Sequence, residues 1–223
     1  MSTLQDNLSL YLVTEESIPL EKLEQIIEEA ILGGVTAVQL REKTADGKTF
    51  YEKALKIKQL LANYSIPLFI NDRVDIALAV EADGIHIGQD DIPLSVVKKV
   101  VPLSMKIGVS VKNVQQALIA EAEGADYIGV GSVFPTATKK DASMLQHGTL
   151  KMICQAVTIP AVAIGGITSA NLPQILDSGI CGAAIVSAIM KADDPRQAAE
   201  SLKKQVTNGK GAYNTKQVNC WGN

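Results

Sequence analysis

Cysteine and histidine are scarce in this sequence, which limits the chemistry it can perform. The 223 residues include three cysteines and two histidines. Cysteines so few and so far apart supply neither a disulfide framework nor a zinc-site spacing, and Cys154 and Cys181 are expected to be small buried apolar residues. His86 lies inside an apolar run and is expected in the core. No Ser-His-Asp arrangement is therefore predicted.

Long apolar runs and an excess of positive charge are also missing. The stretch 179–190 is shorter than the roughly 20 residues that span a bilayer, and the first residues lack the basic and apolar segments of a signal peptide. The net charge is −3, which does not predict a surface for nucleic acid. No glycine spacing matches a nucleotide-binding loop. A cytoplasmic protein with small-molecule partners is expected, with no nucleic acid or membrane partner.

A repeating unit organises the chain instead. A short apolar, β-branched run is followed by a polar turn and then by an amphipathic segment. Short continuous apolar runs are typical of parallel strands buried on both faces. Eight such runs occur, at Ser9–Thr14, Ala37–Glu42, Pro67–Asp72, Gly84–Gln89, Lys106–Val111, Tyr127–Ser132, Ala161–Gly166 and Ala183–Ala188.

The segments between these runs have the spacing of helices. Apolar residues over 23–31 recur every three or four positions, which predicts a helix with one buried face, and Gly33 and Gly34 are expected to end it. Asp194 followed by Pro195 predicts an N-cap and a first helical residue.

Eight strand–helix units predict an α/β fold, a single-domain (β/α)8 TIM barrel. A doubly wound open sheet uses the same alternation and is the main competitor; the count of eight favours the barrel. The expected domain covers residues 1–207. The Gly- and Asn-rich residues 208–223 are expected to be a polar C-terminal tail whose role the sequence does not define.

Polar residues gather where the predicted strands end, which in such a barrel is the rim that carries the active site. Asp72 and Asp91 follow neighbouring strands, about 4.8 Å apart, and Arg41, Lys43 and Lys139 supply positive charge. Acids beside cations favour Mg²⁺ with a polyphosphate, since Mg²⁺ commonly takes one or two carboxylates plus phosphate oxygens. A set of rim salt bridges without a ligand is the alternative.

A second anion site is predicted after the last two strands. Gly165 and Gly166 precede a predicted helix, and loops in this position often bind phosphate in barrels. The other interpretation is that the two glycines only permit a tight turn. Two anion sites on one rim would suit two phosphorylated groups.

Several motifs together resemble the thiamine-phosphate synthase family. They are "QLREK", "FINDRVDIALAVEADGIHIGQDD", "GVSV", "ADYIGVGSVFPTATKKDA" and "AIGGI", and the resemblance covers roughly residues 8–190. It implies a (β/α)8-barrel transferase of thiamine biosynthesis. Such an enzyme joins 4-amino-5-hydroxymethyl-2-methylpyrimidine diphosphate to thiazole phosphate and releases diphosphate and thiamine monophosphate. The sequence does not decide between a monomer and a homo-oligomer.

The resemblance also implies roles for individual residues. It implies that Asp72 and Asp91 bind Mg²⁺, and that Arg41, Lys43, Ser110 and Lys139 act on the departing diphosphate as catalytic residues. The implied contacts to the pyrimidine diphosphate come from Gln39, Leu40, Arg41, Glu42, Lys43 and Asn71, with Ser110 and Lys139 at its diphosphate end. The implied contacts to the thiazole phosphate come from Thr136, Ala137, Thr138, Gly166, Val186 and Ser187.

One departure and two rivals accompany this interpretation. Lys112 stands where the family often has a His, which leaves a peripheral contact undefined. A thiazole tautomerase-like relative, or a regulatory barrel that only binds a phosphorylated ligand, would have the same fold. The tautomerase would not need the two acids or the diphosphate cations, and their presence argues against it.

Overall fold

The computed structural model describes residues 3–136, 144–146 and 148–218. Within them, eight parallel strands pair in sequence order and close into a barrel, as predicted. The strands are β1 (Leu10–Val13), β2 (Ala37–Leu40), β3 (Leu68–Asn71), β4 (Gly84–Ile87), β5 (Lys106–Val111), β6 (Tyr127–Gly131), β7 (Ala161–Ile164) and β8 (Gly182–Ile185). Each lies within or overlaps one of the predicted apolar runs.

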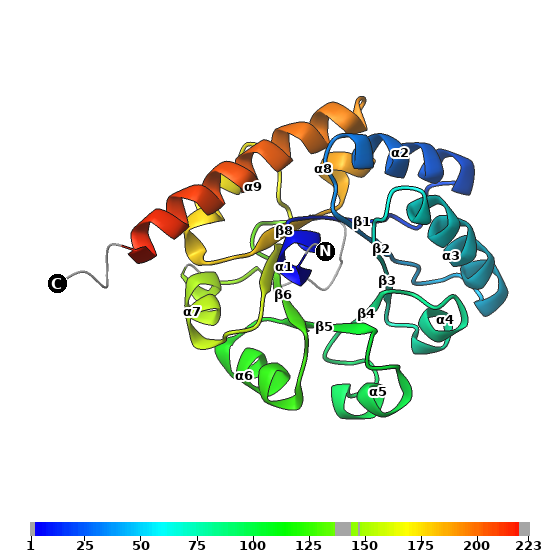
Figure 1. Cartoon of the computed structure of the whole chain (residues 1–223), viewed down its shortest axis with the longest axis horizontal. Coiled ribbons are helices and arrows are strands. Elements are labelled where there is room, and N and C mark those ends of the chain that lie inside the picture. The colour runs from blue at the N-terminus through cyan, green and yellow to red at the C-terminus, as the bar shows by residue number, and fades with distance from the viewer. Residues whose placement is uncertain (1–2, 137–143, 147, 219–223) are drawn as a thin grey trace.

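Helices accompany the strands, and all but the first of them surround the barrel (Figure 1). They are α1 (Leu4–Asn7), α2 (Leu20–Leu32), α3 (Gly47–Ala62), α4 (Val74–Ala79), α5 (Leu94–Val100), α6 (Val114–Glu123), α7 (Thr149–Ala156), the 3₁₀ helix η1 (Leu172–Ser178), α8 (Ser187–Met190) and α9 (Pro195–Val218). Pairing of β1 with β8, which sets Tyr11 opposite Ala184, closes the ring. This pairing excludes the open doubly wound sheet, in which the first and last strands would not meet.

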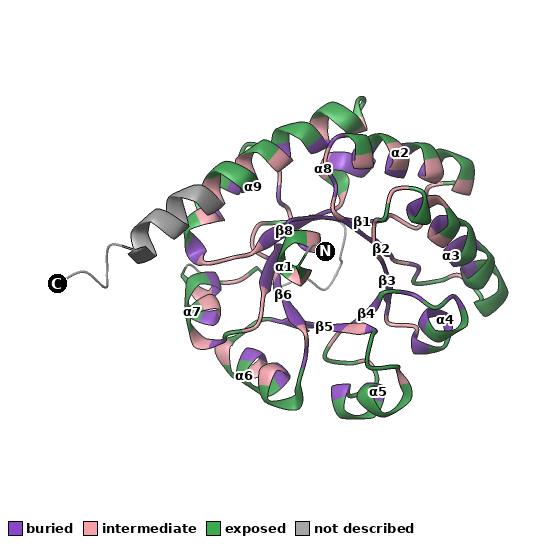
Figure 2. Ribbon diagram, in the orientation of Figure 1, coloured by how far each residue is buried: buried purple, intermediate pink, exposed green. Residues whose placement is uncertain are grey.

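Helix α2 forms as the apolar spacing predicts. Its buried residues are Leu23, Ile26, Ile27 and Ala30, and Gly33 is its C-cap. The buried colour in Figure 2 follows the strands and the inward faces of the helices, and exposed residues face outward. Burial of one stripe per helix against the barrel therefore supplies most of the core.

Helix α9 begins as the sequence predicts and runs further than expected. The Asp194 side chain accepts a hydrogen bond of 2.8 Å from the Gln197 backbone N–H, and Pro195 is the first helical residue. The helix is assigned through Val218, so it crosses the boundary predicted at residue 207. The division into a domain and a tail at that point stays a prediction.

Two apolar layers make up the core, one between barrel and helices and one inside the barrel. The inner layer includes Tyr11, Phe69 and Tyr127, whose rings meet edge to face with Phe69 5.3 Å from Tyr11 and 5.6 Å from Tyr127 between centroids. Leu4 of α1 packs against this layer, and Figure 1 shows α1 at the centre of the ring. The short first helix therefore covers the amino end of the barrel. No helix in the described part of the chain is long and apolar enough to cross a bilayer.

Ile27→Ala should lower the free energy of unfolding by about 2–5 kcal/mol, because it leaves a cavity between α2 and the barrel. Ile27 is 0% exposed, whereas Leu32 of the same helix is 48% exposed. Leu32→Ala is the matched control and should change the stability by no more than about 0.5 kcal/mol. Urea unfolding of both variants measures this, and equal losses would contradict the assignment of the buried face.

Candidate active site

A cavity of about 620 Å³ opens at the carboxyl ends of the strands. Its lining combines the loops after β1, β2, β6, β7 and β8, which the closed barrel brings together. The lining residues are Glu15, Glu16, Ser17, Arg41, Thr44, Pro135, Thr136, Gly166, Thr168, Ser187 and Lys191. Four residues of the predicted site are thus in one cavity: Arg41, Thr136, Gly166 and Ser187.

The two predicted metal ligands lie together at the ends of β3 and β4. The carboxyl group of Asp91 lies close enough to that of Asp72 to raise the pKa of Asp72, and Asp91 Oδ2 accepts a hydrogen bond of 2.6 Å from Gly88 N. The ammonium group of Lys43, from the loop after β2, forms an ion pair with Asp72. Two acids and one cation thus form an acidic corner of the rim, defined here as Lys43, Asp72 and Asp91.

Burial raises the pKa of Asp72, and the neighbouring carboxyl of Asp91 raises it further, while the Lys43 ammonium lowers it. Asp72 also has φ 62°, in the left-handed region that non-glycine residues rarely occupy. Backbone strain of this kind, of order 1–3 kcal/mol, is common at functional sites. A second positive charge between the two acids would relieve their repulsion.

Asn71, the last residue of β3, has a buried amide nitrogen with no hydrogen-bond acceptor among the described residues. The residue is 6% exposed, and no hydrogen bond from Nδ2 to any described residue is present. A buried donor without an acceptor costs about 1–3 kcal/mol. An acceptor on a ligand would recover that cost, which fits the prediction that Asn71 binds substrate.

Two residues predicted to bind substrate have other partners in this structure. Leu40 is fully buried in the layer outside the barrel. Glu42 forms an ion pair of 2.6 Å with Lys53 of α3, with both side chains nearly buried. Burial raises the pKa of the Glu42 carboxyl, and the Lys53 ammonium lowers it. The side chains of both residues thus contribute to packing of the barrel against its helices.

Inside the barrel, a chain of buried hydrogen bonds joins two further residues of the predicted site. Gln39 Nε2 donates to the Tyr11 hydroxyl at 2.9 Å, and the Tyr11 and Tyr127 hydroxyls are 3.1 Å apart. His86 lies 3.0 Å from the Tyr127 hydroxyl through Nδ1 and 2.8 Å from Ser110 Oγ through Nε2. His86 is 8% exposed, which confirms the prediction that it belongs to the core.

The chemistry of the donors and acceptors sets the direction of each hydrogen bond in this network. Burial raises the pKa of Tyr11 and of Tyr127, so both stay protonated. Because an amide nitrogen only donates, the Tyr11 proton goes to Tyr127, and the Tyr127 proton goes to His86 Nδ1. His86 Nε2–H then donates to Ser110 Oγ. The Ser110 hydroxyl proton stays available for an acceptor at the rim, such as a phosphate oxygen.

A glycine on β5 leaves space for the side chains of this hydrogen-bond network. A Cβ on Gly108 would lie 2.1 Å from Cζ of Tyr127 and 2.5 Å from Nδ1 of His86. Such distances are far below van der Waals contact, so any side chain here would displace the two rings.

The glycines after β7 shape the opposite side of the cavity. Gly166 has φ 63°, and a Cβ there would lie 2.3 Å from Pro135 O in the loop after β6. Asn171 holds this turn, since its side chain donates to Gly166 O at 2.9 Å and accepts from Thr168 N at 2.8 Å. The glycines therefore do permit a tight turn, and Gly166 also lines the cavity, so the phosphate-site interpretation stays a prediction. Val186 and Ser187, at the start of α8, lie next along the rim.

Three predicted residues, Ala137, Thr138 and Lys139, lie outside the described residues. Other cavity residues escaped the sequence analysis, among them Glu15, Glu16 and Lys191. Lys191 Nζ is 2.9 Å from Glu15 Oε1, which joins the first and the last unit of the barrel. Residues 14–16 could have been found from the sequence, because they are polar and directly follow an apolar run, like the predicted site residues after the other strands.

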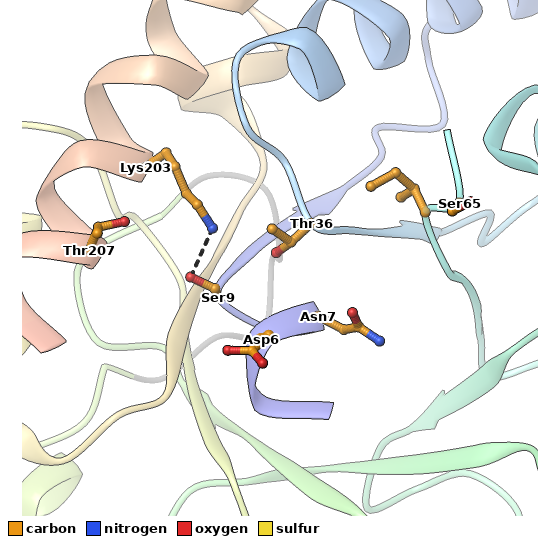
Figure 3. Close-up of a pocket in the computed structure, with 8 residues that line it drawn as sticks. Asp6, Asn7, Ser9, Thr36, Ser65, Lys203 and Thr207 are labelled. Atoms are coloured by element: carbon orange, nitrogen blue, oxygen red, sulfur yellow. Dashed lines mark hydrogen bonds between the residues drawn. The ribbon is translucent and has the colours of Figure 1, made fainter. Parts of the chain in front are cut away.

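A second cavity, of about 400 Å³, lies at the other end of the barrel. Figure 3 shows its polar lining, with Lys203 of α9 donating to Ser9 Oγ at 3.2 Å beside Asp6 and Thr36. It is formed by the amino ends of the strands, where residues of such barrels serve stability. None of the residues predicted to bind substrate lines it.

The closed parallel barrel and the charged cavity on its carboxyl rim define a (β/α)8-barrel enzyme. The sequence profile of the thiamine monophosphate synthase family matches residues 10–189. The chain belongs to this family.

Named relatives agree with the profile. The chain is 50% identical over 199 residues to the thiamine-phosphate synthase of Methanobrevibacter smithii, covering 89% of this chain and 95% of that protein. It is 50% identical over 195 residues to that of Clostridium tetani, covering 87% and 93%. Thiamine phosphate pyrophosphorylase from Pyrococcus furiosus superposes with a TM-score of 0.84 at 42% identity, covering 93% of this chain and 99% of that one.

Tyr127→Phe should lower the free energy of unfolding by about 1–3 kcal/mol, because the Tyr11 hydroxyl then lacks its buried acceptor. Tyr51 of α3 is 37% exposed, and Tyr51→Phe, the matched control, should stay within about 0.5 kcal/mol of the parent. Chemical denaturation measures both. A Tyr127→Phe variant as stable as the control would mean that the interior chain is not energetically coupled.

Proposed function

We propose that this chain makes thiamine monophosphate at the carboxyl rim of its barrel, from a hydroxymethylpyrimidine diphosphate and a thiazole phosphate. Membership of the thiamine monophosphate synthase family supports the reaction. The observation that supports its location is the acidic corner of Lys43, Asp72 and Asp91 beside the cavity that Arg41 lines. Acids and cations together suit a metal-bound diphosphate.

The pyrimidine diphosphate would bind at the ends of β2 to β5. Asn71 offers an amide donor that no described residue uses, and Ser110 offers the hydroxyl proton at the end of the interior chain. Gln39, held by Tyr11, would contact the pyrimidine beside them, and the backbone of Leu40 and Glu42 would border the same site. The cations nearest the diphosphate would be Arg41 and Lys43, joined by Lys139.

The donor set at the acidic corner fits Mg²⁺. Two neighbouring carboxyl groups, with the pKa of Asp72 raised by burial and by Asp91, would hold a divalent cation and be stabilised by its charge. Mg²⁺ usually keeps water and substrate phosphate as its other ligands, so no third side chain is needed. Among the described residues, no group of three or more His, Cys, Asp or Glu gathers as a metal site. Bound Mg²⁺ would neutralise charge on the diphosphate.

Charge stabilisation and positioning would account for the mechanism. The bond between the pyrimidine methylene carbon and the diphosphate oxygen breaks, and both electrons leave with the diphosphate. Arg41, Lys43 and Lys139 stabilise the departing charge, and the Ser110 hydroxyl donates to it. The thiazole nitrogen then gives its lone pair to the pyrimidine cation. That lone pair needs no general base, which agrees with the structural role of His86.

The thiazole phosphate would bind on the β6–β8 side of the cavity. Thr136 and Gly166 lie on this wall, and the start of α8 brings Val186 and Ser187. Ala137 and Thr138 would complete the contact from the β6 loop. Binding of both substrates in one cavity would place the nitrogen close to the methylene carbon, and such positioning supplies much of an enzyme's acceleration.

We further propose a cytoplasmic location, as the few separated cysteines suggest, and small molecules as the main partners. A homo-oligomer remains compatible with the sequence.

Incubation of the purified chain with both substrates and Mg²⁺ tests the proposal. Thiamine monophosphate and diphosphate should form in equal amounts, and omission of the thiazole phosphate should abolish the first product. A tautomerase-like or a regulatory relative would yield neither product.

Asp72→Ala and Asp91→Ala should each lower kcat/KM by about a hundredfold or more. If both acids hold one Mg²⁺, the double variant should be close to the worse single variant, because effects within one unit are not additive. Rates across a Mg²⁺ titration measure this, and added Mg²⁺ should partly restore each single variant. Additive losses that ignore Mg²⁺, or full activity in excess chelator, would show that the acids are rim salt bridges only.

Ser187→Asp should raise the KM for the thiazole phosphate by about tenfold or more, because it sets a negative charge beside the proposed phosphate position. The KM for the pyrimidine diphosphate should change much less. Ser201→Asp, on the exposed face of α9, is the matched control. An unchanged thiazole phosphate KM in Ser187→Asp would place that phosphate elsewhere.

A further inference from the structure

The carboxylate of Glu16 holds the loop that carries two of the cations of the rim, Arg41 and Lys43. Glu16 belongs to the loop between β1 and α2. Its partners lie in the loop between β2 and α3, about 28 positions later in the sequence. Oε1 accepts hydrogen bonds from Thr44 N at 2.7 Å, from Thr44 Oγ1 at 2.5 Å and from Ala45 N at 3.0 Å. Oε2 accepts from Lys43 N at 3.0 Å.

Four hydrogen bonds to one carboxylate set the backbone of three consecutive residues. A neighbouring bond, from Arg41 N to Thr14 Oγ1 at 3.0 Å, ties the start of the same loop to the end of β1. The loop between β2 and α3 is thus held at both ends by residues that follow β1. Its side chains can then reach outward: Arg41 lines the cavity, and Lys43 pairs with Asp72.

The Glu16 carboxyl group stays ionised at neutral pH. The Thr44 hydroxyl and the backbone N–H groups of Lys43, Thr44 and Ala45 lower the pKa of Glu16 to about 2. Hydrogen bonds to an ionised acceptor are roughly twice as strong as neutral ones. The anchor therefore does not titrate in the neutral range.

We propose that Glu16 is a positioning residue for the diphosphate end of the site, acting through the backbone of Lys43, Thr44 and Ala45 rather than by binding substrate itself. This inference rests on the proposed function, which assigns Arg41 and Lys43 to the diphosphate. A flexible loop would have to be ordered each time the diphosphate binds. The carboxylate supplies that order in advance, so binding of this substrate costs less conformational entropy.

The chain contains a matched control for this anchor at the opposite end of the barrel. Glu121 of α6 accepts hydrogen bonds from Thr158 N and Thr158 Oγ1, both at 2.7 Å, and from Ile159 N at 3.2 Å. The chemistry is the same, a partly exposed glutamate that holds the backbone and hydroxyl of a threonine loop. Its loop precedes β7, however, and so lies on the amino face, far from the rim.

The experiment compares Glu16→Gln with Glu121→Gln in the full chain, with each substrate varied while the other is saturating. Glu16→Gln should raise the KM for the pyrimidine diphosphate by about tenfold to a hundredfold, the equivalent of one charged hydrogen bond. The KM for the thiazole phosphate should change less than about twofold. Glu121→Gln should leave both KM values within about twofold, although both variants lower Tm.

Two further variants keep the test decisive if Glu16→Gln folds poorly. Thr44→Val removes one donor of the anchor and should raise the same KM by a smaller factor. Glu16→Gln combined with Lys43→Ala should be little worse than Lys43→Ala alone, because the two changes affect one unit. The Glu16→Gln effect should also be constant across the neutral pH range, since the parent carboxylate does not titrate there.

The outcomes separate this inference from the function on which it rests. An unmodified chain that forms no product would overturn the function itself. An active chain in which Glu16→Gln leaves the pyrimidine diphosphate KM unchanged, raises both KM values equally, or behaves like Glu121→Gln would overturn the positioning role alone.

Discussion

Closure of the barrel between β1 and β8 is the constraint on which the rest of this structure depends. Parallel strands in one closed ring place all their carboxyl ends on one rim. Residues from the first unit and the last then become neighbours, as the 2.9 Å contact between Glu15 and Lys191 shows. The cavity exists because of this closure, since its walls combine loops after β1 and β2 with loops after β6, β7 and β8. An open sheet would separate them.

The inside of the barrel links stability to the site. Three aromatic rings fill much of the interior, yet the polar ends of Tyr11, Tyr127 and His86 pair with one another instead of remaining unsatisfied. Satisfied buried networks of this kind are rigid and specify one arrangement. The hydrogen-bond network begins at Gln39 and ends at Ser110, so packing of the barrel interior also orients these two side chains near the rim.

The rim contains several groups that cost stability in the absence of a ligand. Asp72 combines a left-handed backbone, a half-buried carboxyl and a like-charged neighbour, each of which is unfavourable without a ligand. Asn71 adds a buried donor without a described acceptor. Lys43 offsets part of the acidic charge, and Glu16 in turn holds the backbone of Lys43. Lys43 and Asp72 are thus paired in this structure, at the place where we propose that a diphosphate and a metal ion bind.

The sequence alone determined the strands, helix α2, the cap of α9 and the rim that carries the polar residues, because apolar spacing and caps act over a few neighbouring residues. Only the tertiary structure decided which polar side chains meet. Glu42 forms an ion pair with Lys53, and Gln39 donates a hydrogen bond to Tyr11. Glu16 accepts hydrogen bonds from a loop about 28 residues later in the sequence. Such pairings depend on strand register and barrel closure, which join distant parts of the chain and leave no local pattern in the sequence.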